Sequence, residues 1–299
     1  MIQTQTGIIS KFDAWILASR PRTWAASIVP VLVGTSIAMH DGVFKPLTAL
    51  LALLCAMLIQ IGTNFVNDLF DFIHGSDKQE RLGPTRAAAS GILTKRELWI
   101  GIYFTFGLSF LLGMILVYLG GIFIFTIGVI SILAGIAYTA GPFPLAYHGL
   151  GDIAVFIFFG FVGTMGTYYA QSNTITAMSF WASIPVGALI TNILVVNNYR
   201  DREEDGSNGK NTLIVIFGEN FGRLQYLSFM IISYTILFVV YFTFKKEVSV
   251  FLPVLSLPLA VKLIKMIYTL RGSELNKTLE LTAKLSALYG LLFAAGILL

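Results

Sequence analysis

The sequence is poor in charged residues, cysteine and histidine. Only 12% of its 299 residues are charged, whereas a typical soluble domain carries about 25%, so a soluble globular enzyme and a disordered chain are both excluded. Cys55 is the single cysteine, which excludes a fold built on disulfides within the chain. The three histidines, His40, His74 and His148, lie far apart, and no pair has the spacing of a histidine metal site.

Apolar residues make up 56% of the chain and gather in long runs. A helix needs roughly 20 apolar residues to cross about 30 Å of hydrocarbon. The sequence therefore predicts an all-α polytopic membrane protein with about nine transmembrane helices. The expected spans are 23–39, 47–69, 98–119, 122–140, 152–170, 180–198, 224–244, 250–268 and 281–299. They leave only short loops, so we expect a single integral membrane domain over residues 1–299, surrounded by the lipid bilayer.

The basic residues fall almost entirely on one side of these spans. With the N-terminus inside, 17 of the 20 lysines and arginines lie in the N-terminal segment and near the loops after spans two, six and eight, and only Lys45, Lys245 and Lys246 lie opposite. This asymmetry is typical of cytoplasmic loops. It predicts a prokaryotic plasma-membrane protein with a cytoplasmic N-terminus. It also accounts for the net charge of +4 without a nucleic-acid partner. The N-terminal segment carries Asp13 and Arg20 and is not expected to be a removable signal peptide.

The acidic residues are concentrated at two cytoplasmic helix ends. Ten of the 16 lie in the windows 68–97 and 201–219, although a carboxylate deep in a bilayer costs about 2.5–3.5 kcal/mol. Where the first window begins, polar residues recur at i, i+3, i+4 and i+7, which places them on one face of a helix. They are Asn64, Asn67, Asp68 and Asp71.

The second window repeats part of this pattern. Asn197, Asp201 and Asp205 step by four along one helix face. The element Asn-x-x-x-Asp therefore occurs twice, at 67/71 and at 197/201, with an offset of 130 residues. This repeat predicts two pseudo-repeated halves, about 1–140 and 141–299, each of which supplies one acidic helix end.

Two facing sets of carboxylates suit Mg²⁺, a hard cation that takes oxygen ligands and retains phosphate oxygens in its shell. Basic donors for a diphosphate follow both windows, namely Arg81 and Arg86 after the first and Lys210 after the second. Two other interpretations stay open: the carboxylates could be solvated loop charges, and the arginines could only set the topology.

The loop after the fourth span, 138–152, contains no lysine or arginine and is rich in turn-forming residues. It could cover the site, with Tyr138 and Tyr147 facing a substrate. It could equally be a tight helical hairpin whose tyrosines lie at the membrane interface.

At these motifs the chain resembles the UbiA-type intramembrane prenyltransferase superfamily, and most of all its 1,4-dihydroxy-2-naphthoate branch in menaquinone and phylloquinone synthesis. The first matching motif runs from Asn67 through Asp71, Asp77 and Arg81 to Arg86, and the second runs over 197–213. The general superfamily pattern spaces the first-motif acids by four, whereas position 75 is a glycine here. This departure fits the naphthoate branch.

The resemblance implies nine helices around a central cavity that opens to lipid, and Mg²⁺ ions that bridge both motifs and a prenyl diphosphate. It implies ionisation to an allylic cation, attack by the naphthoate ring and loss of the carboxylate, which gives demethylmenaquinone. The implied metal ligands are Asp68, Asp71, Asp77, Asp201 and Asp205. The implied substrate-binding residues are Asn67, Asn197, Asn198, Arg81, Arg86, Lys210, Tyr138 and Tyr147. Among these, Asp71, Asp201 and Lys210 are the expected catalytic residues.

Three alternatives are weighed against this interpretation. The acceptor could be 4-hydroxybenzoate, homogentisate or a haem. A membrane phosphoalcohol transferase would show a compact run of aspartate, glycine, alanine and arginine that this sequence lacks. A secondary transporter would place its polar residues near the midplane of the bilayer, whereas the acids here lie at helix ends.

Overall fold

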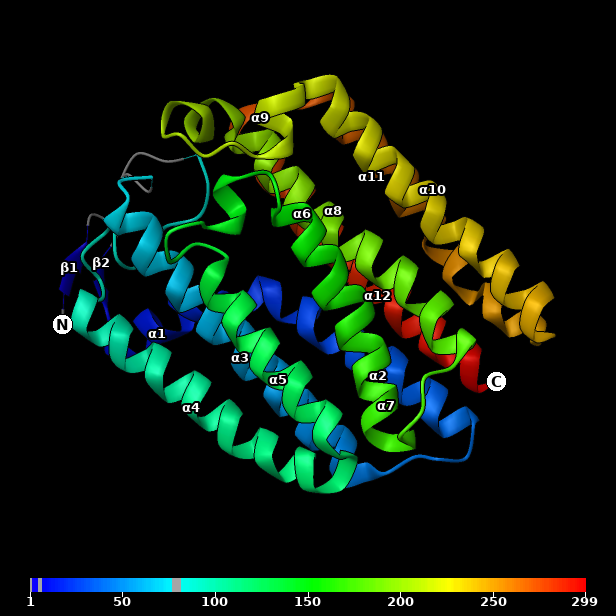
Figure 1. Cartoon of the computed structure of the whole chain (residues 1–299). Coiled ribbons are helices and arrows are strands. Elements are labelled where there is room, and N and C mark those ends of the chain that lie inside the picture. Colours follow the sequence, from blue (N-terminus) through cyan, green and yellow to red (C-terminus); the bar gives the residue numbers. More distant parts are fainter. Residues whose placement is uncertain (1, 5–6, 77–81) are drawn as a thin grey trace.

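The computed structural model describes residues 2–4, 7–76 and 82–299. Most of its helices run roughly side by side along one direction (Figure 1). The α-helices are α1 (Lys11–Ser19), α2 (Trp24–His40), α3 (Pro46–Ile73), α4 (Lys95–Gly120), α5 (Ile122–Ala137), α6 (Gly151–Val155), α7 (Gly166–Ser172), α8 (Ala177–Ser207), α9 (Leu213–Phe217), α10 (Glu219–Phe244), α11 (Leu257–Thr269) and α12 (Leu275–Leu298).

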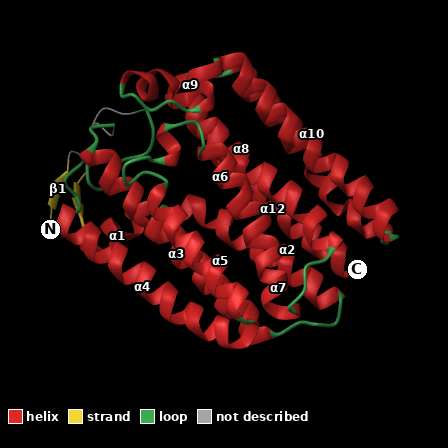
Figure 2. Cartoon of the chain, in the orientation of Figure 1, coloured by secondary structure: helices red, strands yellow, loops and turns green. Residues whose placement is uncertain are grey.

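The remaining elements are short or of another helical type. A π-helix, η3 (Phe156–Met165), joins α6 to α7. The 3₁₀ segments are Pro21–Thr23, Leu145–Tyr147, Val248–Ser256 and Gly272–Glu274. The strands β1 (Ile2–Thr4) and β2 (Gly7–Ile9) pair antiparallel; Figure 2 shows them as the small strand pair near the N-terminus.

The prediction of an all-helical membrane bundle is confirmed. In the described part of the chain, eight helical stretches are long and apolar enough to cross a membrane, and a ninth, α5, is shorter. Each overlaps one predicted span, and several extend further because consecutive helical pieces join, as α6, η3 and α7 do over Gly151–Ser172. The small strand pair was not predicted.

Local sequence explains where several helices begin. Thr94 and Glu97 form a reciprocal capping box at the start of α4, and Thr176 and Ser179 form another at α8. Pro46 occupies the first turn of α3, where its missing N–H would have no intrahelical partner in any case. These residues therefore fix where α3, α4 and α8 begin. The two acidic motifs lie on α3 and α8.

The apolar interior is divided into three clusters. In the largest cluster, residues of α2 pack with residues of α8, α10, α11 and α12. A second lies around α1, α3 and α4, and a smaller third joins α3, α4, α5 and α7. Because α2 belongs to the cluster of the later helices, the clusters do not follow the order of the chain. The division into halves at about residue 140 stays a prediction.

The π-helix and α8 approach closely through two glycines. A Cβ atom added to Gly160 would lie 3.0 Å from the Cα of Gly187, which is closer than ordinary van der Waals contact. Glycine at both positions therefore allows these two segments to pack side by side, and α8 carries the second acidic motif at its far end.

Candidate active site

The end of α3 turns back on Asp71. Gly75 has a φ of +74°, the left-handed conformation that glycine adopts without strain. The N–H of Ser76 donates to the carbonyl of Asp71 at 2.9 Å, and the N–H of Gly75 donates to that of Phe72 at 3.2 Å. These two bonds form a Schellman motif, which returns the Ser76 side chain to the neighbourhood of the Asp71 carboxylate.

The end of α8 repeats this turn at Asp205. Gly209 has a φ of +72°, the N–H of Lys210 donates to the carbonyl of Asp205 at 2.9 Å, and the N–H of Gly209 donates to that of Gly206 at 3.3 Å. The same Schellman motif therefore follows both acids by the same number of residues. By this criterion Asp205, rather than Asp201, is the structural counterpart of Asp71.

Asp201 lies one turn before Asp205 and is held by a buried arginine. Arg200 Nε and Nη2 each lie 2.6 Å from an oxygen of the Asp201 carboxylate, and the Arg200 side chain has no exposed surface. Arg200 also donates to Asn197 at 2.8 Å and to Asn276 at 2.7 Å. This network fixes the Asp201 carboxylate and balances its charge.

The two acidic helix ends line one small polar pocket. Its described lining residues are Asp71, Ser76, Arg86, Asn197, Asp201, Glu204, Asp205 and Lys210. Residues 130 or more positions apart in the sequence thus share a single space, as the duplicated motif predicts.

Opposite charges and a tyrosine surround these carboxylates. Arg86 Nη2 lies 3.7 Å from Asp71, and Lys210 Nζ lies 3.4 Å from Asp205. The Tyr147 hydroxyl donates to Asp71 at 2.9 Å and is 2.8 Å from the Ser76 hydroxyl. The Lys210 ammonium also lies over the Tyr147 ring, 5.8 Å from its centroid. The pocket therefore combines cations and anions in a confined space.

The loop after α5 reaches over this pocket. Besides the contacts of Tyr147, the N–H of Asn211 donates to the Tyr147 carbonyl at 3.1 Å, so the loop is joined to the segment after α8. Thr139 donates to Asn67 at 2.8 Å. Of the two interpretations of this loop, the contacts agree with the one in which it covers the site.

Asp68 does not lie in the polar pocket. Its carboxylate is 1% exposed and accepts hydrogen bonds from the backbone N–H groups of Ala87 and Ala88 at 3.1 and 3.3 Å. It thereby fastens the loop after α3 to the helix. Asn198 is also buried away from the pocket lining. Asp77 and Arg81 lie outside the described residues.

The donor set of the pocket fits a hard cation. Asp205 Oδ2 is buried and has no hydrogen-bond partner among the described residues, and an unpaired carboxylate oxygen is the kind of ligand that Mg²⁺ takes. No three acidic, histidine or cysteine side chains of the described chain already stand together as a metal cluster. This is compatible with Mg²⁺, which commonly uses one or two carboxylates and completes its shell with water and substrate phosphates.

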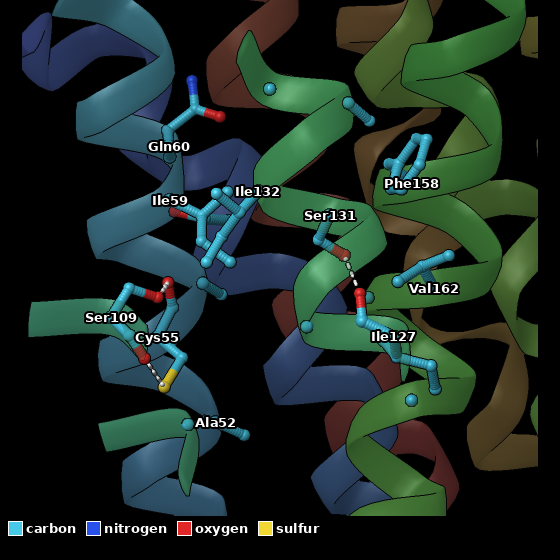
Figure 3. A pocket seen from close by; sticks show the side chains of 18 of the residues that line it. Ala52, Cys55, Ile59, Gln60, Ser109, Ile127, Ser131, Ile132, Phe158 and Val162 are labelled. Atoms are coloured by element: carbon cyan, nitrogen blue, oxygen red, sulfur yellow. Dashed lines mark hydrogen bonds between the residues drawn. The ribbon is translucent and has the colours of Figure 1, made fainter. Parts of the chain in front are cut away.

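A larger, mostly apolar cavity of about 230 Å³ lies among α2 to α7. Figure 3 shows its walls. The labelled lining residues are Ala52, Cys55, Ile59 and Gln60 of α3, Ser109 of α4, Ile127, Ser131 and Ile132 of α5, and Phe158 and Val162 of the π-helix. Its apolar walls suit a hydrocarbon chain.

The cavity and the polar pocket share one face of α3. Ala56, Gln60 and Thr63 line the cavity, and Asn67 and Asp71 continue the same face at steps of four. Thr63 and Asp71 are eight residues apart, which is about 12 Å along a helix axis. A molecule with a polar head and an apolar tail could therefore lie along α3 with the head at Asp71.

Tyr138 lies at the end of the cavity nearest the acids. It belongs to the cavity lining. Its phenol is neutral at physiological pH, since the ordinary pKa of tyrosine is about 10, and it can donate a hydrogen bond.

Sequence reasoning missed several residues of this site. Ser76 and Glu204 line the polar pocket, and Arg200 holds Asp201. Glu204 lies inside the second acidic window and Arg200 directly precedes it, so their charge was a usable signal. Ser76 gave none, because its position depends on the left-handed turn at Gly75.

The chain is similar to proteins of one known family over most of its length. Residues 27–288 match the model of the UbiA prenyltransferase family. This chain belongs to the UbiA prenyltransferase family. It is similar to the 1,4-dihydroxy-2-naphthoate octaprenyltransferases of Escherichia coli (strain K12), 37% identical over 97% of each chain, and of Haemophilus influenzae (strain ATCC 51907 / DSM 11121 / KW20 / Rd), 35% identical over 98% of each.

Solved structures agree on the UbiA fold. A UbiA homolog from Archaeoglobus fulgidus bound to DMAPP and Mg²⁺ superposes with a TM-score of 0.64 at 14% identity, over 93% of this chain and 98% of the other. The same homolog bound to GPP and Mg²⁺ gives 0.64 at 15% identity, over 94% and 99%. The protein is thus an integral membrane protein with the UbiA fold.

Proposed function

We propose that this chain transfers a prenyl group from a prenyl diphosphate to 1,4-dihydroxy-2-naphthoate, with loss of the carboxylate, to give demethylmenaquinol, the reduced form of demethylmenaquinone. The observation that carries the proposal is the convergence of Asp71, Asp201 and Asp205 with Arg86 and Lys210 in one pocket, on the same helix face as a cavity whose apolar walls suit a hydrocarbon tail. The names of the similar proteins support the choice of the naphthoate as acceptor.

Asp71 and Asp205, with Asp201, are the residues that would hold Mg²⁺. The unpaired Oδ2 of Asp205 supports this assignment. All three side chains are carboxylates, and carboxylate oxygens are ligands that Mg²⁺ prefers. When bound, the metal would supply positive charge that stabilises the diphosphate as it leaves. A bound cation would offset the charge of these carboxylates, which would otherwise repel an anionic substrate.

The other residues of the pocket act on the diphosphate and on the reacting carbon. Arg86 and Lys210 contribute cations to the leaving group, whose negative charge grows in the transition state. Ionisation of the allylic C–O bond leaves a carbocation near Tyr138, whose ring presents a π face. The apolar walls of the cavity keep water from this cation, so the naphthoate ring attacks instead.

A product assay tests the proposal. Membranes that contain the protein receive Mg²⁺, a labelled prenyl diphosphate and, in separate reactions, 1,4-dihydroxy-2-naphthoate, 4-hydroxybenzoate and homogentisate. We expect a prenylated, decarboxylated product from the naphthoate alone, identified by its mass, and no product from the Asp71→Asn variant. Product from another acid would refute the acceptor, and uptake of label without any product would favour a transporter.

We also propose that the polar pocket faces the cytoplasm, as the distribution of the basic residues suggests. The lone cysteine, Cys55, is buried, which makes the chain suitable for cysteine labelling. Ser207→Cys places an exposed cysteine at the end of α8 that carries the second acidic motif, and Glu247→Cys places one in the connection that follows the C-terminal end of α10. In intact cells we expect a membrane-impermeant maleimide to label the second variant only. The reverse pattern would invert the topology.

A further inference from the structure

Most of the polar side chains that line the apolar cavity have a partner in the main chain. Cys55 of α3 and Ser109 of α4 donate to each other's carbonyl oxygens, at 3.6 and 3.4 Å. Three further hydroxyls donate to a carbonyl of the same helical stretch at 2.9, 2.8 and 2.7 Å; they belong to Ser27, Ser131 and Thr167. These five groups therefore have a hydrogen bond without any ligand.

Three other lining residues differ from these five. They are Gln60 and Thr63 of α3, and Tyr138 at the end of α5. In the described part of the chain, the hydroxyls of Thr63 and Tyr138 make no hydrogen bond with the protein. A polar group at an apolar cavity is unfavourable until a ligand or a water molecule supplies its partner.

The Gln60 amide is oriented so that its oxygen is the end without a partner. Gln60 Nε2 and Asn64 Nδ2 both donate to the Thr23 hydroxyl at 3.1 Å. The single proton of that hydroxyl goes to the Arg20 carbonyl at 2.9 Å, so the Thr23 oxygen can only accept from Gln60. The amide nitrogen must therefore face Thr23. The carbonyl oxygen has no donor among the described residues and belongs to the cavity wall shown in Figure 3.

These three residues lie together at the end of the cavity nearest the polar pocket. Gln60 and Thr63 are three residues apart, on one face of α3. A Cβ atom added to Gly135 of α5 would collide with Thr63 Oγ1, and Tyr138 follows Gly135 by three residues on the same helix face. Thr63 precedes Asp71 by about 12 Å along the helix axis. We call Gln60, Thr63 and Tyr138 the polar corner of the cavity.

The chemistry of the two substrates decides which of them fits the polar corner. The prenyl tail has no polar atom, and the diphosphate has its partners in the polar pocket. The aromatic acceptor must reach the allylic carbon, which adjoins the diphosphate, and it carries ring hydroxyls. A hydroxyl both donates and accepts, so one ring hydroxyl can donate to Gln60 and accept from Thr63.

We propose that Gln60 and Thr63 bind one ring hydroxyl of the aromatic acceptor, which donates to Gln60 Oε1 and accepts from Thr63 Oγ1. Tyr138 bounds this place on the side of α5. The inference rests on the proposed function and adds to it two residues that select the acceptor. A hydroxyl held here fixes how the ring is turned, and therefore which ring carbon faces the allylic carbon.

The test compares 1,4-dihydroxy-2-naphthoate with 1-hydroxy-2-naphthoate and 4-hydroxy-2-naphthoate, each of which lacks one hydroxyl. Binding of each compound to the purified protein in lipid nanodiscs is measured with Mg²⁺ and a non-hydrolysable prenyl diphosphate analogue. In the wild type, loss of the hydroxyl that lies in the polar corner should weaken binding about 3- to 10-fold, the effect of one neutral hydrogen bond. One of the two monohydroxy compounds should therefore bind more weakly by this factor.

The variants Gln60→Met and Thr63→Val keep the size of each side chain and remove its hydrogen bond to the acceptor. Each should bind the dihydroxy compound about 3- to 10-fold more weakly than the wild type does, and should no longer distinguish it from the weaker monohydroxy compound. The KM for prenyl diphosphate should stay unchanged, because neither residue lines the polar pocket.

Thr105→Val is the matched control. Thr105 is a buried threonine of α4 whose hydroxyl donates to the Gly101 carbonyl at 2.8 Å, and it is not among the cavity-lining residues. This variant should bind all three compounds as the wild type does. Loss of discrimination in Thr105→Val equal to that in Thr63→Val would overturn the inference, because it would show a general effect on packing.

Two other results would also overturn the inference. The first is equal binding of all three compounds by the wild type, which needs no variant to fold. The second is a folded Gln60→Met or Thr63→Val variant that binds the acceptor normally and changes only the longest prenyl chain accepted, since the corner would then belong to the tail. If the wild type forms product from the naphthoate and the binding pattern is absent, only this inference fails. If it forms no product, the proposed function fails and the inference fails with it.

Discussion

Replacement of Arg200 by glutamine is expected to destabilise the protein strongly. The Arg200 side chain is fully buried, and two of its nitrogens lie 2.6 Å from the two oxygens of Asp201. Removal of one partner of a buried ion pair costs about 3–5 kcal/mol, because the other charge stays buried without compensation. Arg200→Gln and Asp201→Asn should therefore each lower the free energy of unfolding by about this amount.

The double variant Arg200→Gln/Asp201→Asn separates this charge effect from simple loss of packing. It contains neither charge, so its loss of unfolding free energy should be smaller than the sum of the single losses by about 2 kcal/mol or more. Equilibrium unfolding in detergent, followed by circular dichroism, measures all three differences.

The chain offers a matched exposed pair as a control. Lys284 and Glu280 are 2.7 Å apart, with side chains that are 63% and 39% exposed. Glu280→Gln should cause no measurable change, since exposed pairs contribute little. Strictly additive losses at Arg200 and Asp201 would refute the reasoning, because they would mean that the two side chains do not stabilise each other.

Three further predictions concern turnover and substrate binding. Asp71→Asn should abolish turnover without preventing membrane insertion, because the side chain lines the polar pocket; activity of the purified variant near that of the wild type would contradict a metal role. Lys210→Ala should raise the KM for prenyl diphosphate about 10-fold, the loss expected for one charge-assisted contact, and an unchanged KM would exclude contact with the diphosphate. Gly128→Phe should shorten the longest prenyl chain accepted, since Gly128 lines the cavity and has open space beside it. Gly107→Phe, on an exposed face of α4, should leave the chain length unchanged, and equal effects of both would argue against the cavity as the tail site.

The spans and the meeting of the two acidic motifs could be predicted because each depends on a periodic signal. A run of about 20 apolar residues crosses a bilayer whatever its neighbours are. The four-residue spacing that ends at Asp71 and at Asp205 places each carboxylate on a definite face of its helix. The duplication predicted that the two faces meet, and residues of both motifs line one pocket in the structure.

The partner of each charge could not be predicted, because it depends on contacts between distant segments. Asp68 has the same spacing and residue type as a metal ligand, yet it accepts hydrogen bonds from the backbone of Ala87 and Ala88. Asp152 begins a predicted span and gave no sign of burial. Its burial follows from the packing of α6 against α8, which no local pattern contains.

The glycine turns after α3 and α8 separate the backbone placement of each acid from the structure of the connection that follows it. The reversal at Gly75 and at Gly209 is made by main-chain bonds, so the placement of each acid is independent of the segment that follows. After Gly75 the chain runs through a long connection before α4 begins at Lys95, whereas after Gly209 the next helix begins at Leu213. Sequence changes that spare Arg86 and Lys210 can therefore accumulate in these connections during evolution and reshape the cover over the substrates, while the backbone geometry of the anionic centre is retained.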